Sequence, residues 1–285
     1  MTVSAPPLKV LVLETASVCN LRCIHCAYSI GLTPHRTPTF IDVDLVNRVL
    51  EQVGYVDTCY PALWGEPTLH PQLLDVLVAI RPRAKSVVLT TNGVQVTEQL
   101  AASIARRVDR VLVGIPAATA TMYQTMCGMD RFDDAMRGLR LFIADAPQKT
   151  SWIFVVTSAN EGEADAARVL AAELGVDLVF RSAFLAPGIK VGPASTAALS
   201  RYTADGTPRG DRLGCRAFWE AMQIQADGKV TTCCYDFHDE VVVGDANTQH
   251  VINDIWNGAA YQALRENHLA GKLATFCRDN CGTPY

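Results

Sequence analysis

The sequence has no long hydrophobic run and no strong excess of charge of either sign. Among its 285 residues, no apolar stretch approaches the roughly 18 residues that a membrane-spanning helix needs. The 25 basic against 29 acidic side chains give a net charge of −4, which argues against a nucleic-acid-binding surface. The early Lys9 and the Pro6-Pro7 pair do not form a signal peptide. We therefore expect a cytoplasmic protein that binds neither membranes nor nucleic acid.

Cysteine, by contrast, is abundant, with ten residues in the chain. Structural disulfides are not expected, because cytosolic reductants keep thiols reduced. Seven or eight of the ten fall in two groups, one near the start of the chain and one in its last quarter. Clustered thiols in a reducing compartment are more often metal ligands than disulfide partners. The composition therefore predicts metal binding.

Short β-branched runs alternate with amphipathic stretches from Leu8 to about Ala183. The predicted strands are Lys9–Leu13, Thr58–Trp64, Ser86–Thr91, Arg110–Ile115, Trp152–Thr157 and Asp177–Arg181. The predicted helices are Val43–Val53, Pro71–Ile80, Glu98–Arg107, Phe132–Ala144 and Glu163–Leu174. Apolar strands separated by helices are typical of a parallel sheet buried on both faces. This predicts an α/β fold like an incomplete barrel, with its chemistry in the loops after the strands.

After Ala186 the pattern changes to loops rich in glycine and proline. A hairpin is predicted next, with an Asp227-Gly228 turn between residues 222–226 and 229–232. Two helices are expected to follow, at Val251–Trp256 and Ala259–Ala270. We place the domain boundary between residues 185 and 215, and predict domains at 1–185 and 186–285.

The first cysteine group reads C-x₃-C-x₂-C, with Cys19, Cys23 and Cys26 directly after the first predicted strand. Three thiolates can bind three irons of a [4Fe–4S] cluster and leave the fourth iron open to a small molecule. A zinc site completed by His25 or His35 is the alternative.

Two further motifs follow the next two predicted strands, Gly65-Glu66-Pro67 and Thr91-Asn92-Gly93. Together with the cysteines they resemble the radical S-adenosylmethionine (SAM) superfamily, over residues 8–180. The resemblance implies that the three cysteines bind a cluster whose open iron takes SAM. It also implies that Gly65, Glu66 and Pro67 hold the methionyl ammonium, and that Asn92 and Gly93 line the SAM pocket. Two departures are visible, His25 before the third cysteine and Gly114-Ile115-Pro116 after the fourth strand.

The second group consists of Cys215, Cys233, Cys277 and Cys281. Four thiols suit a fully ligated cluster or a structural zinc site; with zinc alone, the chain would be a binding module without catalysis. Together with Gly228, Cys234, Gly244 and Trp256, they resemble the SPASM/twitch family of radical SAM enzymes. The cysteines suffice for one auxiliary [4Fe–4S] cluster, as in the twitch form. Either Cys233 or Cys234 can be the ligand, and we prefer Cys233.

The implied fold is α/β, a partial (β/α)₆ radical SAM barrel with a small C-terminal twitch or SPASM-like iron–sulfur domain. The implied chemistry is reductive cleavage of SAM to a 5′-deoxyadenosyl radical, which takes hydrogen from a substrate carbon. An external one-electron reductant of the flavodoxin or ferredoxin type is implied as a partner.

Compact members of the family include the dehydrogenase that acts on 2-deoxy-scyllo-inosamine, and enzymes that epimerise aminoglycosides. Members that modify ribosomally made peptides commonly add an N-terminal recognition domain, for which a barrel beginning by residue 8 leaves no room. We therefore expect a small polar substrate of antibiotic biosynthesis, whose secondary alcohol is oxidised to a ketone. Epimerisation and peptide modification are the two alternatives.

Arg181, Cys127 and Cys234 are the candidates for catalysis. Arg181 ends the sixth predicted strand and can orient a substrate oxygen or form a rim salt bridge. Cys127 and Cys234 are rival hydrogen donors for an epimerase, with a buried, inert thiol as the other reading of Cys127. Cys59 is expected in the core, and His35 and His70 have no expected catalytic role. Tyr235, Asp236, His238 and Asp239 either line the substrate gap or form a solvated loop.

Overall fold

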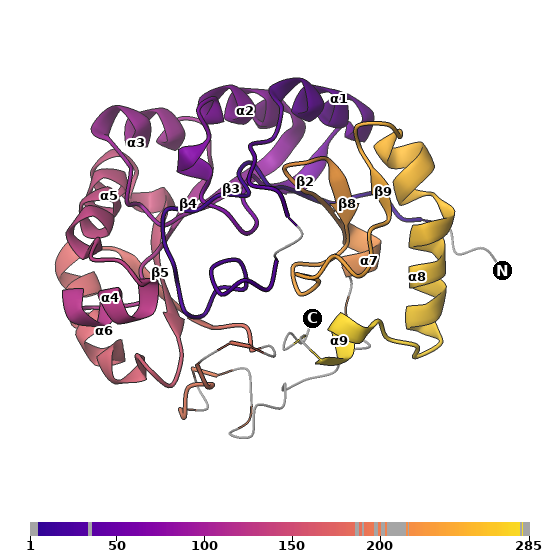
Figure 1. Cartoon of the computed structure of the whole chain (residues 1–285). Helices are drawn as coiled ribbons and strands as arrows, with labels where there is room; N and C mark the ends of the chain where they lie inside the picture. The colour runs from indigo at the N-terminus through magenta and orange to yellow at the C-terminus, as the bar shows by residue number, and fades with distance from the viewer. Residues whose placement is uncertain are drawn as a thin grey trace.

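The computed structural model describes residues 5–33, 36–185, 188–189, 191–196, 199–200, 203, 215, 217–279 and 281. Six parallel strands alternate with helices in its first part. The strands are β1 (Val10–Leu13), β2 (Val56–Tyr60), β3 (Ala84–Thr91), β4 (Arg110–Gly114), β5 (Thr150–Val156) and β6 (Asp177–Ser182). The helices are α1 (Val43–Val53), α2 (Leu73–Ile80), α3 (Glu98–Ala105), α4 (Ala120–Cys127), α5 (Phe132–Asp145) and α6 (Ala164–Leu174). The predicted partial (β/α)₆ barrel is confirmed, with the helices on the outer face of a curved sheet (Figure 1).

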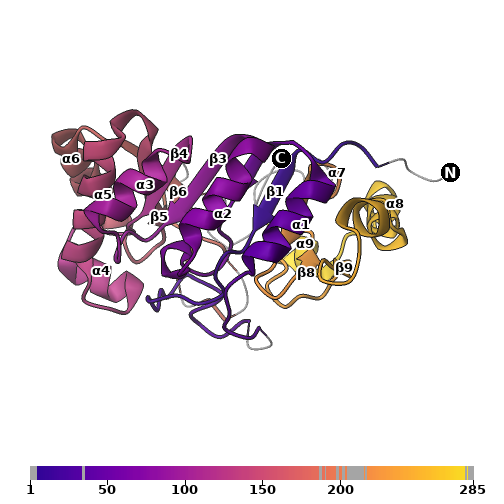
Figure 2. The ribbon, with the colours of Figure 1, turned by 90° about the horizontal axis from the view of Figure 1, so that it is seen from above.

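The C-terminal part continues the same sheet. Its strands are β7 (Ala221–Ile224), β8 (Lys229–Thr231) and β9 (Gly244–Asp245). In the described residues the sheet has nine strands, in the order β6-β5-β4-β3-β2-β1-β7-β8-β9. The remaining helices are α7 (Ala217–Glu220), the π-helix η6 (Val251–Trp256), α8 (Ala259–Leu269) and α9 (Thr275–Asp279). Figures 1 and 2 accordingly place α6 and α8 at opposite ends of the sheet.

The predicted hairpin is confirmed, because β7 and β8 pair antiparallel around the Asp227-Gly228 turn. Its attachment was not predicted: β7 pairs in parallel with β1, so that Gln223 lies opposite Val12. The division at residue 185 remains a prediction, since Ala186, Pro187 and residues 204–214 lie outside the described residues.

The core forms between the sheet and the outer helices. In β1, Leu11 and Leu13 are fully buried against the helices, whereas Val12 points into the lumen of the barrel. Helix α1 begins where the Asp42 carboxylate accepts a hydrogen bond from the Asp44 N–H at 3.1 Å. Short 3₁₀ helices complete several connections, at η1 (Pro67–Leu69), η2 (Arg81–Arg83), η3 (Pro147–Lys149) and η4 (Glu161–Glu163). No helix in the described part of the chain could span a membrane.

In the barrel part of the chain, strand β2 and helix α4 differ from the prediction. The strand predicted at Thr58–Trp64 ends at Tyr60, because Pro61 has no N–H to continue the ladder. Helix α4 lies in a region without a predicted helix, although its N-cap Thr119 and its C-cap Gly128 are ordinary boundary signals.

Helix α5 approaches the loop after β3 very closely at Gly138. Alanine is favoured over glycine by about 1 kcal/mol in a helix interior, but a Cβ here would lie 2.1 Å from the Gly93 carbonyl oxygen. This backbone atom cannot rotate away, so we expect Gly138→Ala to cost about 1–3 kcal/mol of stability and to lower the melting temperature in circular dichroism. Gly162→Ala, with nothing within 4 Å, is the control. An unchanged or higher Tm for Gly138→Ala would contradict this close contact.

Candidate functional site

One cavity of about 470 Å³ opens at the carboxyl ends of the strands. It brings together residues that are far apart in the sequence and that include most of the predicted site. The predicted residues that line it are Cys19, Cys23, Gly65, Glu66, Asn92, Cys127, Arg181 and Cys234. Cys26, Pro67 and Gly93 belong to the same loops but do not line this cavity.

The loop with the first three cysteines packs against the end of α4. The Arg22 N–H donates to the Cys127 carbonyl at 2.9 Å, and the Ile24 N–H donates to the Met126 carbonyl at 3.0 Å. The three thiols are half-buried, and burial raises the pKa of Cys19 to about 12 and also raises that of Cys26. Cysteine binds a metal as the thiolate, so a bound cation has to offset the free-energy cost of ionising these buried thiols.

His25 is not a surface side chain. Burial lowers the pKa of His25 to about 4, so the ring is neutral at pH 7. Its Nδ1 is buried without a partner among the described residues, and the residue lines the cavity. His35 lies outside the described residues. His70 is structural as expected, because its Nε2 is 2.8 Å from the Ile41 carbonyl oxygen and its Nδ1 accepts from the Gln72 N–H.

Glu66 organises two of the loops. Its Oε1 accepts hydrogen bonds from the Thr68 N–H at 3.0 Å, the Thr68 hydroxyl at 2.7 Å and the Thr91 hydroxyl at 2.6 Å. Its Oε2 accepts from the Asn92 N–H at 2.7 Å. Burial raises the pKa of Glu66, while these donors stabilise the carboxylate. Oε2 accepts one hydrogen bond where Oε1 accepts three, and Glu66 lines the cavity.

Asn92 connects this pair of loops to the cysteine loop. Its Nδ2 donates to Asn20 Oδ1 at 2.7 Å and lies 3.9 Å from Cys19 Sγ. The Asn92 Oδ1 accepts from the Val94 N–H at 3.0 Å, which fixes the turn. The three predicted motifs therefore form one hydrogen-bonded unit beside the cavity.

Two polar side chains line the cavity, one from β6 and one from β7. Arg181 is exposed at the end of β6, and Gln223 lines the cavity from β7. Gln223 is 7% exposed, and its Oε1 is buried without a partner among the described residues. Gln225, two residues along the same face, donates to Asp239 at 2.6 Å. Gln223 was missed in the sequence, because its place in the barrel depends on the pairing of β7 with β1.

The adjacent cysteines Cys233 and Cys234 face different sites. Cys233 lines a small second cavity together with Cys215, Cys277 and Cys281. Cys234 instead lines the main cavity. This placement supports the preference for Cys233 as the fourth ligand. Cys59 is fully buried in β2, as expected.

The main cavity is lined by none of the four candidates in the loop after Cys234, which are Tyr235, Asp236, His238 and Asp239. Tyr235 is buried against Phe184, with ring centroids 4.6 Å apart. The Asp236 carboxylate caps its own loop by accepting from the Glu240 and Val241 N–H groups. His238 is exposed. The expectation that these side chains line the substrate gap is not supported.

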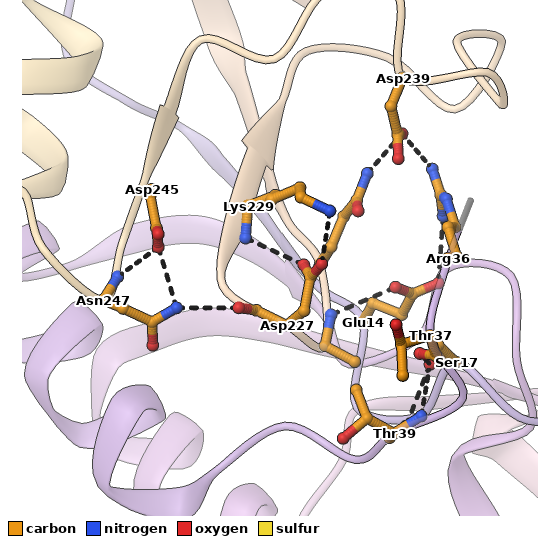
Figure 3. A network of polar contacts seen from close by, with 12 residues as sticks. Glu14, Ser17, Arg36, Thr37, Thr39, Asp227, Lys229, Asp239, Asp245 and Asn247 are labelled. Atoms are coloured by element: carbon orange, nitrogen blue, oxygen red, sulfur yellow. Dashed lines mark hydrogen bonds and ion pairs between the residues drawn. The ribbon is translucent and has the colours of Figure 1, made fainter.

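Asp239 belongs to a buried ionic network, shown in Figure 3. Arg36, with a side chain only 4% exposed, contacts the Glu14 carboxylate at 3.4 Å and Asp239 at 2.6 Å. Burial raises the pKa of Glu14 to about 7, although Arg36 and the Ala226 N–H lower it. The network joins the end of β1, the segment after the cysteine loop and the C-terminal loop.

Removing the positive charge of Arg36 from this network should lower the stability of the fold. An uncompensated buried charge typically costs about 3–5 kcal/mol, so we expect Arg36→Met to lower the Tm by about 2–4 °C for each kcal/mol lost. The loss of stability should be greater at about pH 8 than at about pH 6, because only above its pKa of about 7 is wild-type Glu14 ionised and stabilised by Arg36.

Arg168→Met removes an exposed ion pair with Asp165 and the contact of the guanidinium with the Phe180 ring. It is the control, with an expected effect of about 1 kcal/mol. Equal melting temperatures for the Arg36 and Arg168 variants would show that the buried network does not stabilise the fold.

Comparisons with known proteins agree with the geometry. The model of the radical SAM superfamily matches residues 13–170, and the SPASM model, described as an iron–sulfur cluster-binding domain, matches residues 215–282. Mycofactocin maturase MftC of Mycobacterium tuberculosis is 24% identical over 94% of this chain and 76% of its own length. GTP 3′,8-cyclase of Pasteurella multocida is 31% identical over 131 residues, which cover 45% of this chain and 39% of the cyclase.

Three solved structures share the fold. BtrN in complex with AdoMet and 2-DOIA has a TM-score of 0.63 and 17% identity, covering 98% of this chain and 97% of BtrN. Streptococcus suis SuiB bound to SAM has a TM-score of 0.71 and 17% identity, over 92% of this chain and 68% of SuiB. Native anSMEcpe with bound AdoMet has a TM-score of 0.69 and 15% identity, over 96% of this chain and 89% of anSMEcpe.

The superfamily model covers more than half of the chain, and the SPASM model covers the second cysteine group. The cofactors are accordingly SAM and [4Fe–4S] clusters, and the zinc alternative is set aside. The chain belongs to the radical SAM superfamily and carries a C-terminal SPASM domain.

Proposed function

We propose that this radical SAM enzyme is a dehydrogenase, which oxidises a secondary alcohol of a small polyhydroxylated or aminated substrate to a ketone. The observation that carries the proposal is the shared cavity. It combines the thiols of Cys19 and Cys23 with two polar side chains suited to a small polar substrate, Arg181 and Gln223. The substrate class we propose is an aminocyclitol or aminoglycoside of antibiotic biosynthesis.

The residues present fit the cofactors. Cys19, Cys23 and Cys26 would hold the SAM-binding cluster, with Gly65, Glu66, Pro67, Asn92 and Gly93 around SAM. Cys215, Cys233, Cys277 and Cys281 would hold the auxiliary cluster beside the second cavity. When bound, these groups would supply two things. One is a 5′-deoxyadenosyl radical, which removes a hydrogen atom from the substrate, and the other is an acceptor for the second electron.

The chain itself positions the substrate and keeps water away. Gln223 Oε1, a buried acceptor without a protein partner, can accept a hydrogen bond from a hydroxyl or ammonium group. Arg181 can donate to a substrate oxygen and favour loss of the hydroxyl proton. Trp64 lines the cavity and packs on Phe184, with ring centroids 5.9 Å apart, so that part of the wall is apolar. Contacts of the substrate with Gln223, Arg181 and the apolar wall would fix the orientation of the reacting carbon.

The part of the lumen farther from the carboxyl ends of the strands is apolar, which limits how far a polar substrate can enter the barrel. Val88, Leu112 and Ile153 form a buried cluster inside the barrel, with Val155 and Val179 packed on it. Polar groups lie above this floor at Thr90, Arg181 and Gln223. The substrate is thus expected to bind at the level of the strand ends, near Cys19 and Cys23.

Peptide modification is the second candidate. It is favoured by the similarity to mycofactocin maturase MftC over 94% of this chain and by the fold shared with SuiB bound to the precursor peptide SuiA, at a TM-score of 0.68. BtrN, the neighbour covered almost completely, holds the small molecule 2-DOIA instead. We favour the small molecule because of the buried acceptor of Gln223.

The product discriminates oxidation from epimerisation. With 2-deoxy-scyllo-inosamine and related aminocyclitols, SAM and a flavodoxin-type or chemical one-electron reductant in D₂O, we expect a product that lacks two hydrogen atoms. Mass spectrometry measures this change, with a reaction without SAM as the control. Because oxidation needs no hydrogen donor, Cys127→Ala and Cys234→Ala should keep most turnover.

A product of unchanged mass except for one solvent deuterium, lost in either Cys127→Ala or Cys234→Ala, would instead establish epimerisation. Failure of every aminocyclitol, together with a mass change on a ribosomally made peptide, would establish the second candidate.

A further inference from the structure

Strand β4 ends in a glycine that no backbone requirement explains. Gly114 pairs with Ile153 of β5 in the regular ladder, and its φ does not lie in the left-handed region that favours glycine. Apart from its chain neighbours, a Cβ there would meet only one atom of the described residues within 4 Å, the Thr91 carbonyl oxygen at 3.8 Å. This is an ordinary van der Waals distance, so close packing does not require glycine either.

A side chain at this position would point into the main cavity. Successive side chains of a strand point to opposite faces of the sheet. In β4, Val113 belongs to the core beneath the outer helices, whereas Leu112 belongs to the apolar cluster inside the barrel. Gly114, two residues after Leu112, therefore faces the lumen, and it lines the cavity.

The loop after Gly114 is held in place by side chains of β5 and of the loop that follows β5. The Trp152 indole N–H donates to the Ile115 carbonyl at 2.8 Å, and Asn160 Nδ2 donates to the Pro116 carbonyl at 2.7 Å. Trp152 and Asn160 are fully buried. The backbone therefore cannot easily move into the space beside Gly114, which is a fixed feature of the cavity wall.

The same wall carries a side chain that is proposed to contact the substrate. Val155 lies on β5, the strand next to Gly114, and pairs with Arg181 of β6, and all three residues line the cavity. This cavity of about 470 Å³ would have to take SAM and a substrate together, whereas a pocket for one small molecule commonly occupies roughly 300–1,000 Å³. Space is therefore limiting, and a bound ligand should be sensitive to each carbon atom added to the wall.

We propose that Gly114 is a specificity-determining residue, which by having no side chain leaves room for the ring of the substrate on the Arg181 side of the cavity. The inference rests on the proposed function, because it takes Arg181 as a substrate contact. The residues expected around SAM come from the loops after β2 and β3, so the affinity for SAM should not depend on this space. A larger side chain at position 114 would exclude the substrate without disturbing the fold.

The test is calorimetry on the anaerobically reconstituted full-length protein, with 2-deoxy-scyllo-inosamine as the ligand, in the presence of SAM and without a reductant, so that no turnover occurs. Because overpacking becomes more costly with added volume, the dissociation constant should rise about twofold in Gly114→Ala and about tenfold in Gly114→Val. The Tm should stay equal or rise, because alanine and valine suit a strand better than glycine. The dissociation constant of SAM should not change.

Gly162→Val is the matched control. It adds the same side chain where nothing lies within 4 Å among the described residues, and Gly162 does not line the cavity. This variant should bind both ligands as wild type does.

Equal affinity of wild type and Gly114→Val for the aminocyclitol would overturn the inference while leaving the proposed function intact. A lower Tm in both Gly114 variants would also overturn it, because the fold would then require the glycine. A loss of SAM affinity as large as that of the aminocyclitol would assign the space to the cofactor and contradict the inference. A wild-type protein that binds no aminocyclitol in the presence of SAM would contradict the proposed function together with this inference.

Discussion

The buried carboxylate of Glu66 holds the loops after β2 and β3 together by accepting four hydrogen bonds from Thr68, Thr91 and Asn92. An isolated buried carboxylate would be strongly unfavourable, and charge-assisted hydrogen bonds offset that cost. Asn92 then extends the network to Asn20 in the cysteine loop. The cysteine loop is therefore linked, through Asn92 and Asn20, to a carboxylate 46 residues after Asn20 at the same edge of the sheet.

The barrel and the placement of its motifs could be predicted from the sequence, because both have local signals. Apolar runs separated by amphipathic stretches indicate parallel strands, and each motif directly follows a strand, so all of them meet at one edge. Gln223 and Arg36 could not be predicted in this way. Gln223 reaches the cavity only because β7 pairs with β1, and Arg36 finds Asp239 across 203 residues. Neither long-range pairing leaves a local pattern.

The two cysteine groups are joined through shared surroundings as well as through the sheet. Trp64, from the motif loop after β2, packs on Phe237 with ring centroids 6.1 Å apart, and Cys26 and Cys234 pack on the same apolar cluster. Arg36 adds a buried ionic contact between the two parts of the chain. The cavity therefore has one wall from each part of the chain.

The central claim is that the two cysteine groups hold separate clusters, of which only the first responds to SAM. It is tested most directly by iron content and electron paramagnetic resonance of the anaerobically reconstituted protein. The account predicts about eight irons in wild type, and about four irons without a SAM response after replacement of Cys19, Cys23 and Cys26 by alanine. Replacement of Cys215, Cys233 and Cys277 should preserve the SAM response. A SAM response that survives loss of the first group would contradict the account.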